Sequence, residues 1–246
     1  MVSASQLDVV LSPITDADLV EVVSAMPALG LPRSPAGSLK FDLPQAEGNW
    51  AAFPTVYGPI EHPLPHAERL ATTLHRLRML LASPSVLPVK ATVGTADGPL
   101  AGIAIWHRVA AGEPIFHLKR HRATPEALAA ETDADRAAWA AVNDGWEAMW
   151  GSWDKAREEI MGSVPHLYLA PLWVHPQYQG RGIGAKLLQQ QIDLADKSGD
   201  AMYLEASRAG QPVYERRGFV VEGKSEGYPE MVRWGTSGGK NAAAAK

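Results

Sequence analysis

The hydrophobic and polar positions of this 246-residue chain alternate between strand-like and helix-like segments. Short apolar runs bounded by glycine, proline or charge are typical of strands, and apolar positions three or four apart are typical of amphipathic helices. The order is mixed α and β, not a regular βαβ repeat. Strands are predicted at residues 9–14, 89–94, 100–109, 166–174, 201–206, 219–222 and 230–234. Helices are predicted from about residue 15 and at residues 67–82, 125–161, 185–197 and 212–217.

Two long segments depart from this regular pattern. Residues 27–65 combine many prolines and glycines with scattered aromatic residues, which predicts a long irregular loop. Residues 125–161 are helical in composition, and their tryptophans recur on one face of the expected helix. Such a stripe ordinarily packs on the core. The alternative is that part of it lines a pocket.

Composition and charge exclude several classes of protein. Hydrophobic residues are 46% and charged residues 20%, as in ordinary globular proteins. The formal net charge of -4 gives no electrostatic case for binding nucleic acid or an anionic membrane. With no cysteine, disulfides, thiolate nucleophiles and Cys-ligated metals are impossible. Because no membrane-length apolar run or signal-peptide pattern occurs, we expect a cytoplasmic protein.

The most informative motif is Gln179-Gly180-Arg181-Gly182-Ile183-Gly184, which lies between a strand pattern and a helix pattern. Its three alternate glycines leave backbone N–H groups without a shielding Cβ. Because a helix is predicted from Ala185, these groups would lie at a helix N-terminus. Unpaired donors and the helix dipole bind phosphate there. The ligand expected is a phosphorylated cofactor.

Two phosphate-binding interpretations compete for this loop. Gly180, Gly182 and Ala185 fit a variant of the dinucleotide fingerprint, and Glu205 falls where a ribose-binding acid would sit. That interpretation implies an NAD-dependent enzyme. However, four residues separate the strand from Gly180, whereas the fingerprint requires a tighter turn. A P-loop fails because no Gly-Lys-Ser/Thr occurs in register.

The second interpretation uses more of the chain. The segment Leu169–Gly184 resembles the acetyl-CoA signature of the GCN5-related N-acetyltransferases, the GNAT superfamily, and residues 179–184 match its Q/R-x-x-G-x-G/A motif. The segment Pro212–Phe219 matches a second signature, a tyrosine on a short helix that ends in Gly-Phe. The resemblance covers residues 165–223 in detail. The stretch around Tyr203–Ser207 also resembles the antibiotic-modifying and fungal small-molecule branches of the family.

The resemblance implies a fold, a cofactor and its binding residues. The expected fold is α/β, with a mixed, mostly antiparallel central sheet flanked by helices and a splayed pair of strands at the cofactor. One such domain is expected over residues 1–236, with a helical insertion at about 124–162 and a disordered tail at 237–246. The expected cofactor is acetyl-CoA (coenzyme A). Its contacts would come from Leu172, Trp173, Val174, Gln179, Gly180, Arg181, Gly182, Ile183, Gly184, Ala185 and Ser207.

Two catalytic residues are also implied. Tyr214 would be the general acid that protonates the leaving sulfur, unless it simply packs at the helix end. Glu205 is the candidate general base, because a partly buried carboxylate has a raised pKa. Its alternative role is to order a loop or bind a cationic acceptor. His166 and His175 flank the cofactor strand, where a relay through water is a further possibility.

The expected reaction is acetyl transfer to a primary amine of a small molecule, directly in a ternary complex, because there is no cysteine nucleophile. Segments 41–57 and 124–162 would shape the acceptor pocket. We expect a monomer or homodimer that binds neither nucleic acid nor membrane. The alternatives are a protein or peptide N-acetyltransferase, a non-catalytic CoA-binding module and an NAD-dependent enzyme. Prolines interrupt the His62/His66 pair, so no metal site is expected. The basic run 117–122 is interpreted as a solvated face or a contact to the CoA 3′-phosphate.

Overall fold

The computed structural model of the chain describes residues 7–25, 80–111, 152–225 and 227–236, with the single positions 74, 77, 78, 129 and 132. The chain divides into two compact units. The first contains residues 1–15, 84–115 and 152–246, and the second contains residues 16–83 and 116–151. The expectation of one domain over residues 1–236 stays a prediction.

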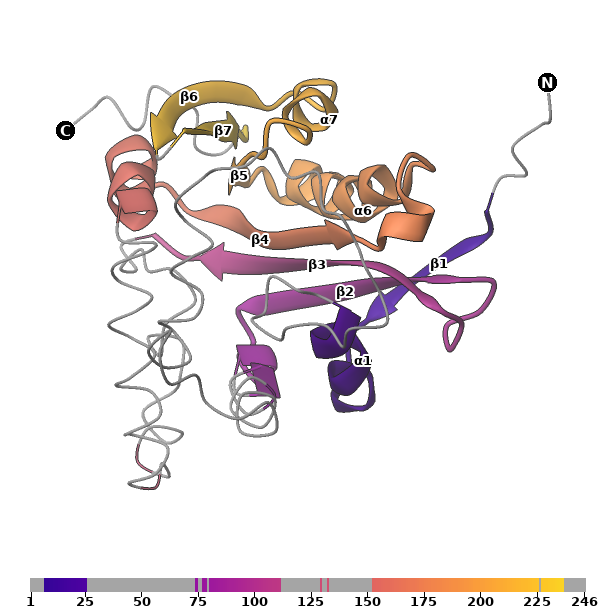
Figure 1. Cartoon of the computed structure of the whole chain (residues 1–246). Coiled ribbons are helices and arrows are strands. Elements are labelled where there is room, and N and C mark those ends of the chain that lie inside the picture. The colour runs from indigo at the N-terminus through magenta and orange to yellow at the C-terminus, as the bar shows by residue number, and fades with distance from the viewer. Residues whose placement is uncertain are drawn as a thin grey trace, which may run out of the picture. The chain divides into compact units, whose positions relative to one another are not determined.

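The described strands form one seven-stranded sheet in the order β1-β2-β3-β4-β5-β7-β6 (Figure 1). Only β4 and β5 pair in parallel, and the other five pairings are antiparallel. The predicted mixed, mostly antiparallel sheet is therefore confirmed, and each predicted strand is present within a few residues. The strands are β1 (Val9–Pro13), β2 (Val86–Val93), β3 (Leu100–Val109), β4 (His166–Val174), β5 (Ala201–Glu205), β6 (Val220–Ser225) and β7 (Tyr228–Arg233).

One face of the sheet packs against the helix α6 (Ile183–Ser198). This helix contacts β2, β3 and β4, and it runs beside β4 in Figure 1. Its buried Leu187 and Leu188 join the larger core cluster, to which β4 contributes Leu167 and Leu169. The helix begins two residues before the predicted start and ends at Gly199, whose φ of 75° closes the last turn.

The opposite face of the sheet packs against a helix at residues 152–161. Side chains alternate between the two faces of a strand, so Tyr168 and Tyr203 point away from the α6 face. They form a second cluster with Met161 from this helix. The helix confirms the end of the predicted helical segment 125–161. The two helices therefore cover opposite faces of the sheet and contact different strand residues.

The strands β4 and β5 pair over only three residues, from His166 to Tyr168 on β4. Beyond Tyr168 the two strands separate, which confirms the splayed pair implied by the resemblance. On its other edge β4 carries a bulge, because Ala104 and Trp106 of β3 lie opposite Leu172 and Leu169. One extra residue of β4 therefore lies between these pairs, in the part of the strand that contains Ala170 and Pro171.

Two shorter helices and a glycine turn complete the described part of the first unit. A 3-10 helix, η5 (Pro176–Tyr178), follows β4 and was not predicted from the sequence. The helix α7 (Gln211–Glu215) follows β5 and is shorter than the predicted segment 212–217. Gly218 adopts a φ of 82°, which fits the predicted turn at the end of that segment.

In the second unit, η1 (Asp16–Asp18) leads into α1 (Leu19–Ala25). Three apolar residues of α1 are buried, as expected for an amphipathic helix: Leu19, Val22 and Val23. Residues 74, 77, 78, 80 and 81 are helical, which agrees with the helix predicted at 67–82. Arg78 forms an ion pair with Asp16.

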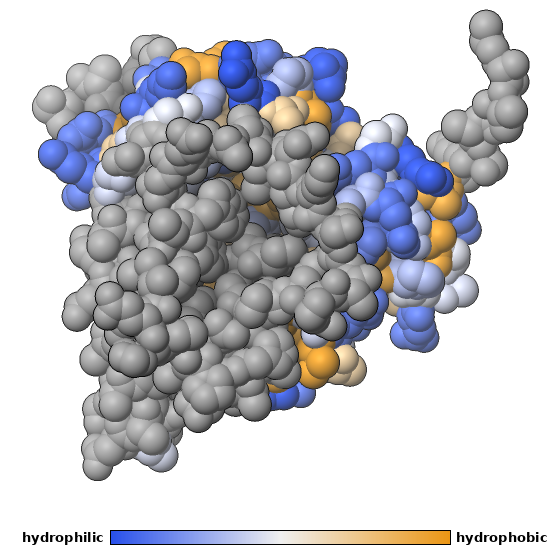
Figure 2. Space-filling model, in the orientation of Figure 1, coloured by the Kyte–Doolittle hydropathy of each residue, from blue (hydrophilic) through white to orange (hydrophobic). Residues whose placement is uncertain are grey.

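Several predictions concern residues outside the described ranges. These are the loop at 27–65, most of the insertion at 124–162, the pair His62/His66, the basic run 117–122 and the tail at 237–246. Among the described helices, none combines the length and apolarity that crossing a bilayer requires. On the face seen in Figure 2, the described surface is mostly hydrophilic with separate hydrophobic patches.

Candidate active site

The glycine loop lies directly before α6, as the sequence predicts. Gly180 and Gly182 have φ angles of 73° and 79°, a region that only glycine enters without strain. A Cβ built on either residue would meet nothing within 4 Å, so space around the loop is open. Gly182 is the N-cap of α6, and no side chain caps that end. The first N–H groups of the helix therefore keep the donor capacity that an anion requires.

Gln179 and His175 hold the approach to this loop. The Gln179 side-chain amide donates a hydrogen bond to the carbonyl of Val174 at 3.1 Å. The Nδ1 atom of His175 accepts a hydrogen bond from the backbone N–H of Gln177 at 3.3 Å, which caps η5. These contacts make His175 a structural residue of the turn. They fix the end of β4 relative to the first glycine of the loop.

The splayed end of β4 lies close to the start of α6. A Cβ on Gly184 would lie 3.4 Å from Val174 Cγ2 and 3.5 Å from Leu172 Cδ2, in ordinary van der Waals contact. Leu172 and Val174 therefore face the helix, and Trp173 between them faces the opposite side of the sheet. Trp173 Nε1 is buried and has no hydrogen-bond partner among the described residues.

Tyr214 lies on α7 with its ring packed edge-on against Phe219, 5.9 Å between centroids. The side chain is 8% exposed, and burial raises its pKa to about 12. The phenol is therefore protonated at neutral pH. Ser207 Oγ accepts a hydrogen bond from the N–H of Gly210 at 3.1 Å, so this side chain orders the turn that leads into α7.

Glu205 is the last residue of β5, where the strand has already parted from β4. Burial raises its pKa from 4.5 to about 7, although the positive charge of Arg157 and a hydrogen bond from the Tyr168 phenol both oppose the shift. Its Oε1 atom is buried and has no hydrogen-bond partner among the described residues. A carboxylate with such a pKa can take a proton near neutral pH.

Arg157 brings a buried positive charge to the same face of the sheet. It comes from the helix at 152–161 and is fully buried. Its guanidinium lies 3.9 Å above the centre of the Tyr168 ring and forms a 2.8 Å ion pair with Asp154. Stacking on an aromatic face and pairing with a carboxylate are the two arrangements that a planar guanidinium favours. The helix thus holds a charge pair beside Glu205.

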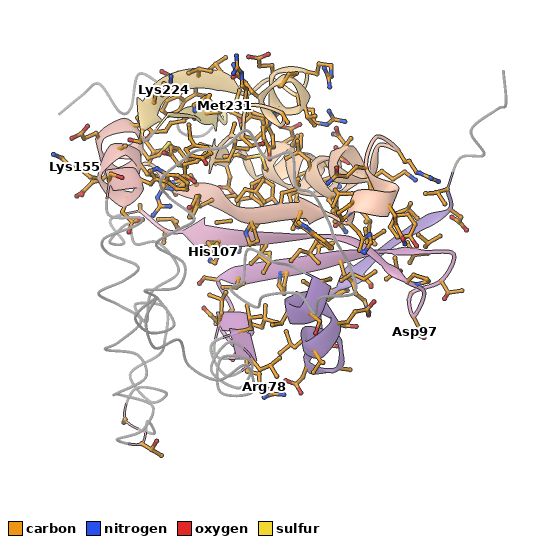
Figure 3. All side chains as sticks on the ribbon, viewed as in Figure 1. Arg78, Asp97, His107, Lys155, Lys224 and Met231 are labelled. Atoms are coloured by element: carbon orange, nitrogen blue, oxygen red, sulfur yellow. The ribbon has the colours of Figure 1, made fainter. Side chains whose placement is uncertain are left out.

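Two buried histidines support β4. His107 on β3, labelled in Figure 3, donates from Nε2 to the carbonyl of Ala170 at 3.1 Å and so binds the bulged part of β4. His166 donates from Nδ1 to the carbonyl of Val164 at 2.7 Å at the start of the strand. His166 is only 2% exposed and is the first of the three residues of β4 that pair with β5, which indicates a structural role.

The predicted site residues come from consecutive elements, β4 to α7, with Ser207 between Glu205 and α7. Residues 172–174 and Glu205 lie on the parts of β4 and β5 that no longer pair, and the loop 179–185 leads into α6. Tyr214 joins the core cluster on the α6 face, whereas Glu205, two residues after Tyr203, projects to the other face of β5. Of the predicted tryptophan stripe, Trp153 is described, and it packs edge-on against Tyr228 at 5.1 Å.

Sequence analysis missed the polar cluster formed by Asp154, Arg157, Tyr168, Tyr203 and Glu230. The spacing of Asp154 and Arg157, three apart on a predicted helix, was a signal for an ion pair. The burial of this ion pair could not be predicted from the sequence, because it depends on which strands lie beneath the helix. Glu230 adjoins the apolar residues Met231 and Val232, and a charged residue in such a strand is a sign of a functional group.

Comparison with known proteins identifies the domain. Residues 102–219 match the Acetyltransferase (GNAT) family. Arylalkylamine N-acetyltransferase 2 from Aedes aegypti has a similar fold, with 13% identity, a TM-score of 0.50 and coverage of 92% of this chain and 99% of that one. A Corynebacterium glutamicum structure described as histone acetyltransferase HPA2 and related acetyltransferase aligns with 20% identity, a TM-score of 0.49 and coverage of 93% and 97%. The PaiA N-acetyltransferase from Thermoplasma acidophilum, in complex with coenzyme A, aligns with 13% identity, a TM-score of 0.44 and coverage of 92% and 99%.

The family match spans β3, β4, the glycine loop, α6, β5 and α7, which are the elements that surround the opening between β4 and β5. This chain therefore carries an acetyltransferase domain of the GNAT family at residues 102–219.

Proposed function

We propose that the chain transfers an acetyl group from acetyl-CoA to a primary amine of a small molecule, in one step within a ternary complex. The observation that carries the proposal is the separation of β4 from β5 beyond Tyr168, in a chain whose glycine loop leads into the uncapped start of α6. Glu205 at the end of β5 and Tyr214 on α7 follow α6 along the chain and are the residues proposed for proton transfer. Acetyl-CoA would supply the activated acetyl group as a thioester. The chain contains no cysteine, so an acyl-cysteine intermediate is impossible.

The loop and strand fit a phosphorylated carrier with an extended arm. The backbone N–H groups of Gly180 to Ala185 would bind a diphosphate, because the helix start is uncapped and the glycines leave space around it. Leu172 to Val174 would bind the arm along an edge of β4 that has lost its pairing with β5. A carbonyl oxygen there could accept from a free N–H of β4, which would stabilise developing negative charge.

Glu205 would take the proton from the attacking ammonium nitrogen. A free amine is needed for attack, and an aliphatic amine with a pKa near that of lysine, about 10.4, is almost entirely protonated at pH 7. Burial of Glu205 raises its pKa to about 7, so the carboxylate is a stronger base than an exposed glutamate. The nearby positive charge of Arg157 limits the rise in the pKa of Glu205.

Tyr214 would return a proton to the sulfur atom as the thiolate leaves. Its phenol is protonated at neutral pH because burial raises its pKa to about 12. The fixed ring beside Phe219 would present the hydroxyl in one orientation. Ser207 would act mainly through the turn before α7, since its oxygen already accepts from Gly210.

A binding experiment followed by a turnover experiment tests the proposal. Acetyl-CoA and CoA should raise the melting temperature of the protein, because each binds only the folded state, whereas NAD should leave it unchanged. A panel of small primary amines is then supplied with acetyl-CoA, and the released thiol is measured. No stabilisation by any CoA species would refute the proposal, and stabilisation by NAD alone would favour a dinucleotide-dependent enzyme.

The same two experiments distinguish a CoA-binding module and a peptide acetyltransferase from the proposed enzyme. A non-catalytic CoA-binding module would be stabilised by acetyl-CoA but would release no thiol with any amine or peptide. A protein or peptide acetyltransferase would release thiol with a peptide panel and not with the small amines. Both panels should therefore be run at the same concentration of amine.

A further inference from the structure

Glu205 lies directly opposite a second buried carboxyl group, Glu230 on β7. The register of the antiparallel pair β5 and β7 places these two residues side by side. Directly opposite residues project to the same face, with Cβ atoms about 5 Å apart. That face is the one covered by the helix at residues 152–161, because Ile160 of the helix lies close to Gly223, the partner of Glu230 on β6. The two acidic residues thus lie on one face of the sheet, with Glu230 buried and Glu205 partly exposed. The Glu230 carboxyl extends over Gly223, because a Cβ on that glycine would lie 2.7 Å from Glu230 Oε2.

Neither carboxyl group is fully satisfied by the protein. Glu230 is 1% exposed, and its Oε1 atom has no hydrogen-bond partner among the described residues. The same is true of Oε1 of Glu205. Buried carboxylate oxygens without a donor carry a desolvation cost, which is avoided when a proton or a cation lies between them.

The negative charge of the Glu205/Glu230 pair and its neighbours exceeds the positive charge around it. Among the described residues of this face Arg157 is a buried cation, and its charge is shared between Asp154, at 2.8 Å, and Glu205, whose pKa it lowers. Glu159 of the same helix adds negative charge near Glu230, and Lys155 lies 3.9 Å from Glu159 at the exposed side of the helix. The remaining titratable neighbours, Tyr168 and Tyr203, have phenols whose pKa is raised by burial, so they are neutral donors.

We propose that Glu230 is the second carboxylate of the acceptor site, and that the Glu205/Glu230 pair binds the acceptor as a primary alkylammonium ion. An ammonium group has three N–H donors, so it can donate to Oε1 of both residues at once. The inference rests on the proposed function and adds the charge state of the acceptor. It favours aliphatic amines, which are protonated in solution, over neutral aromatic amines.

A metal ion is the other cation that two carboxylates could bind. Among the described residues, however, no three His, Asp or Glu side chains gather in a geometry that could hold a metal. The Tyr168 ring is already occupied by the guanidinium of Arg157, 3.9 Å from its centre, so the acceptor site proposed here depends on the two carboxylates and not on an aromatic face. The lack of a third ligand among the described residues favours an ammonium ion over a metal.

Glu230 is a positioning residue in this scheme, and Glu205 takes the proton. The N–H bond of the ammonium breaks, and its proton passes to a carboxylate oxygen of Glu205. The nitrogen lone pair is then available for attack. Glu230 stays ionised and keeps the nitrogen in place. Removal of Glu230 should therefore weaken binding of the acceptor more than it slows the chemical step.

The test uses n-butylamine as the probe, with 1-butanol as an uncharged analogue, each titrated calorimetrically into the full chain saturated with CoA. The wild type should bind butylammonium and not butanol. Glu230→Gln keeps the shape of the side chain and should weaken binding about tenfold or more, because a charge-assisted hydrogen bond is lost. Glu230→Asp keeps the charge and should recover part of the binding. Glu222→Gln is the matched control, since Glu222 lies on the adjacent strand β6, where its carboxyl accepts a hydrogen bond from Nε1 of Trp234, the residue that follows β7.

Steady-state kinetics distinguish the positioning role of Glu230 from a merely structural role. With butylamine as acceptor, Glu230→Gln should raise KM for the amine about tenfold with kcat within about threefold of wild type. Equal affinity of Glu230→Gln and wild type for butylammonium would overturn the inference, as would butanol binding as well as the amine. If CoA binds but no acetyl transfer occurs, the proposed function fails alone, and loss of butylammonium binding in Glu230→Gln still supports the cation site.

Discussion

Burial of Glu205 makes the stability of this protein depend on pH in a direction that is unusual for a carboxyl group. Its pKa is raised from 4.5 to about 7, mainly by burial. Each pKa unit corresponds to about 1.4 kcal/mol, so ionising this group in the folded protein costs about 3 kcal/mol. A raised folded-state pKa gives stability that is fully present below the unfolded pKa and is lost as pH rises through the folded pKa. The window is therefore pH 4.5 to about 7.

Comparison with Glu205→Gln isolates this effect from every other titrating group. Glutamine cannot ionise, so the wild type should lose about 2.5 kcal/mol of unfolding free energy relative to the variant between about pH 5 and pH 8. Urea denaturation at roughly pH 5, 6, 7 and 8, followed by tryptophan fluorescence, measures the difference at each pH. Glu215→Gln is the control, because it makes the same change from carboxyl to amide at a residue that is exposed on α7.

The same ionisation should appear in the enzyme kinetics. A general base must be deprotonated, so kcat/KM should rise with pH and level off above about 7. Glu205→Gln should lower kcat about 10²- to 10⁴-fold, the range measured for general bases. A stability difference between wild type and Glu205→Gln that stays constant across this pH range would refute the argument from burial. An unchanged rate profile in the variant would remove Glu205 as the base.

Three further perturbations test other parts of the site. Gly182→Ala should destabilise the protein by roughly 1 kcal/mol and weaken acetyl-CoA binding, because the residue has a φ of 79°. Gly227→Ala, where φ is 86°, is the control: it should cause similar strain but leave the affinity for acetyl-CoA, measured by calorimetry, unchanged. Tyr214→Phe should lower kcat about 10²-fold and leave the affinity for acetyl-CoA unchanged, since the ring contact with Phe219 remains. Full activity of this variant would exclude Tyr214 as the general acid. Arg157→Met removes the buried ion-pair partner of Asp154, so denaturation should show a loss of about 3–5 kcal/mol in unfolding free energy, and an additional Asp154→Asn change should restore most of the stability. Because the Arg157 charge lowers the pKa of Glu205, the acid limb of the rate profile should also move to higher pH.

The features that could be predicted from the sequence have local causes. Gly180 and Gly182 reveal the loop because their left-handed backbone depends on residue type, and the helix pattern after them fixes where the loop ends. Tyr214 could be assigned because it sits within a short motif that carries its own helix and turn. The strand pattern at 166–174 was likewise sufficient to place β4 in the sheet.

The features that could not be predicted depend on contacts between distant segments. Glu230 lies opposite Glu205 only because of the register between β5 and β7, which no local sequence pattern determines. Arg157 is recognisable as one member of an i, i+3 pair, but its burial depends on how its helix lies over Tyr168. The bulge in β4 depends on the register with β3 and on the bond from His107 to Ala170.

The three-residue junction between β4 and β5 has a consequence for how the fold responds to its ligand. Pairing holds β1 to β4 together on one side and β5 to β7 on the other, and among the described strands only the ladder at His166–Tyr168 joins these two groups. A ligand arm bound between β4 and β5 beyond Tyr168 would act as a substitute strand and stabilise the contact between the two groups. Amide protons of residues 172–174 and 204–205 should then exchange with solvent many times more slowly once CoA is bound, so that the enzyme tightens around its donor before it meets an acceptor.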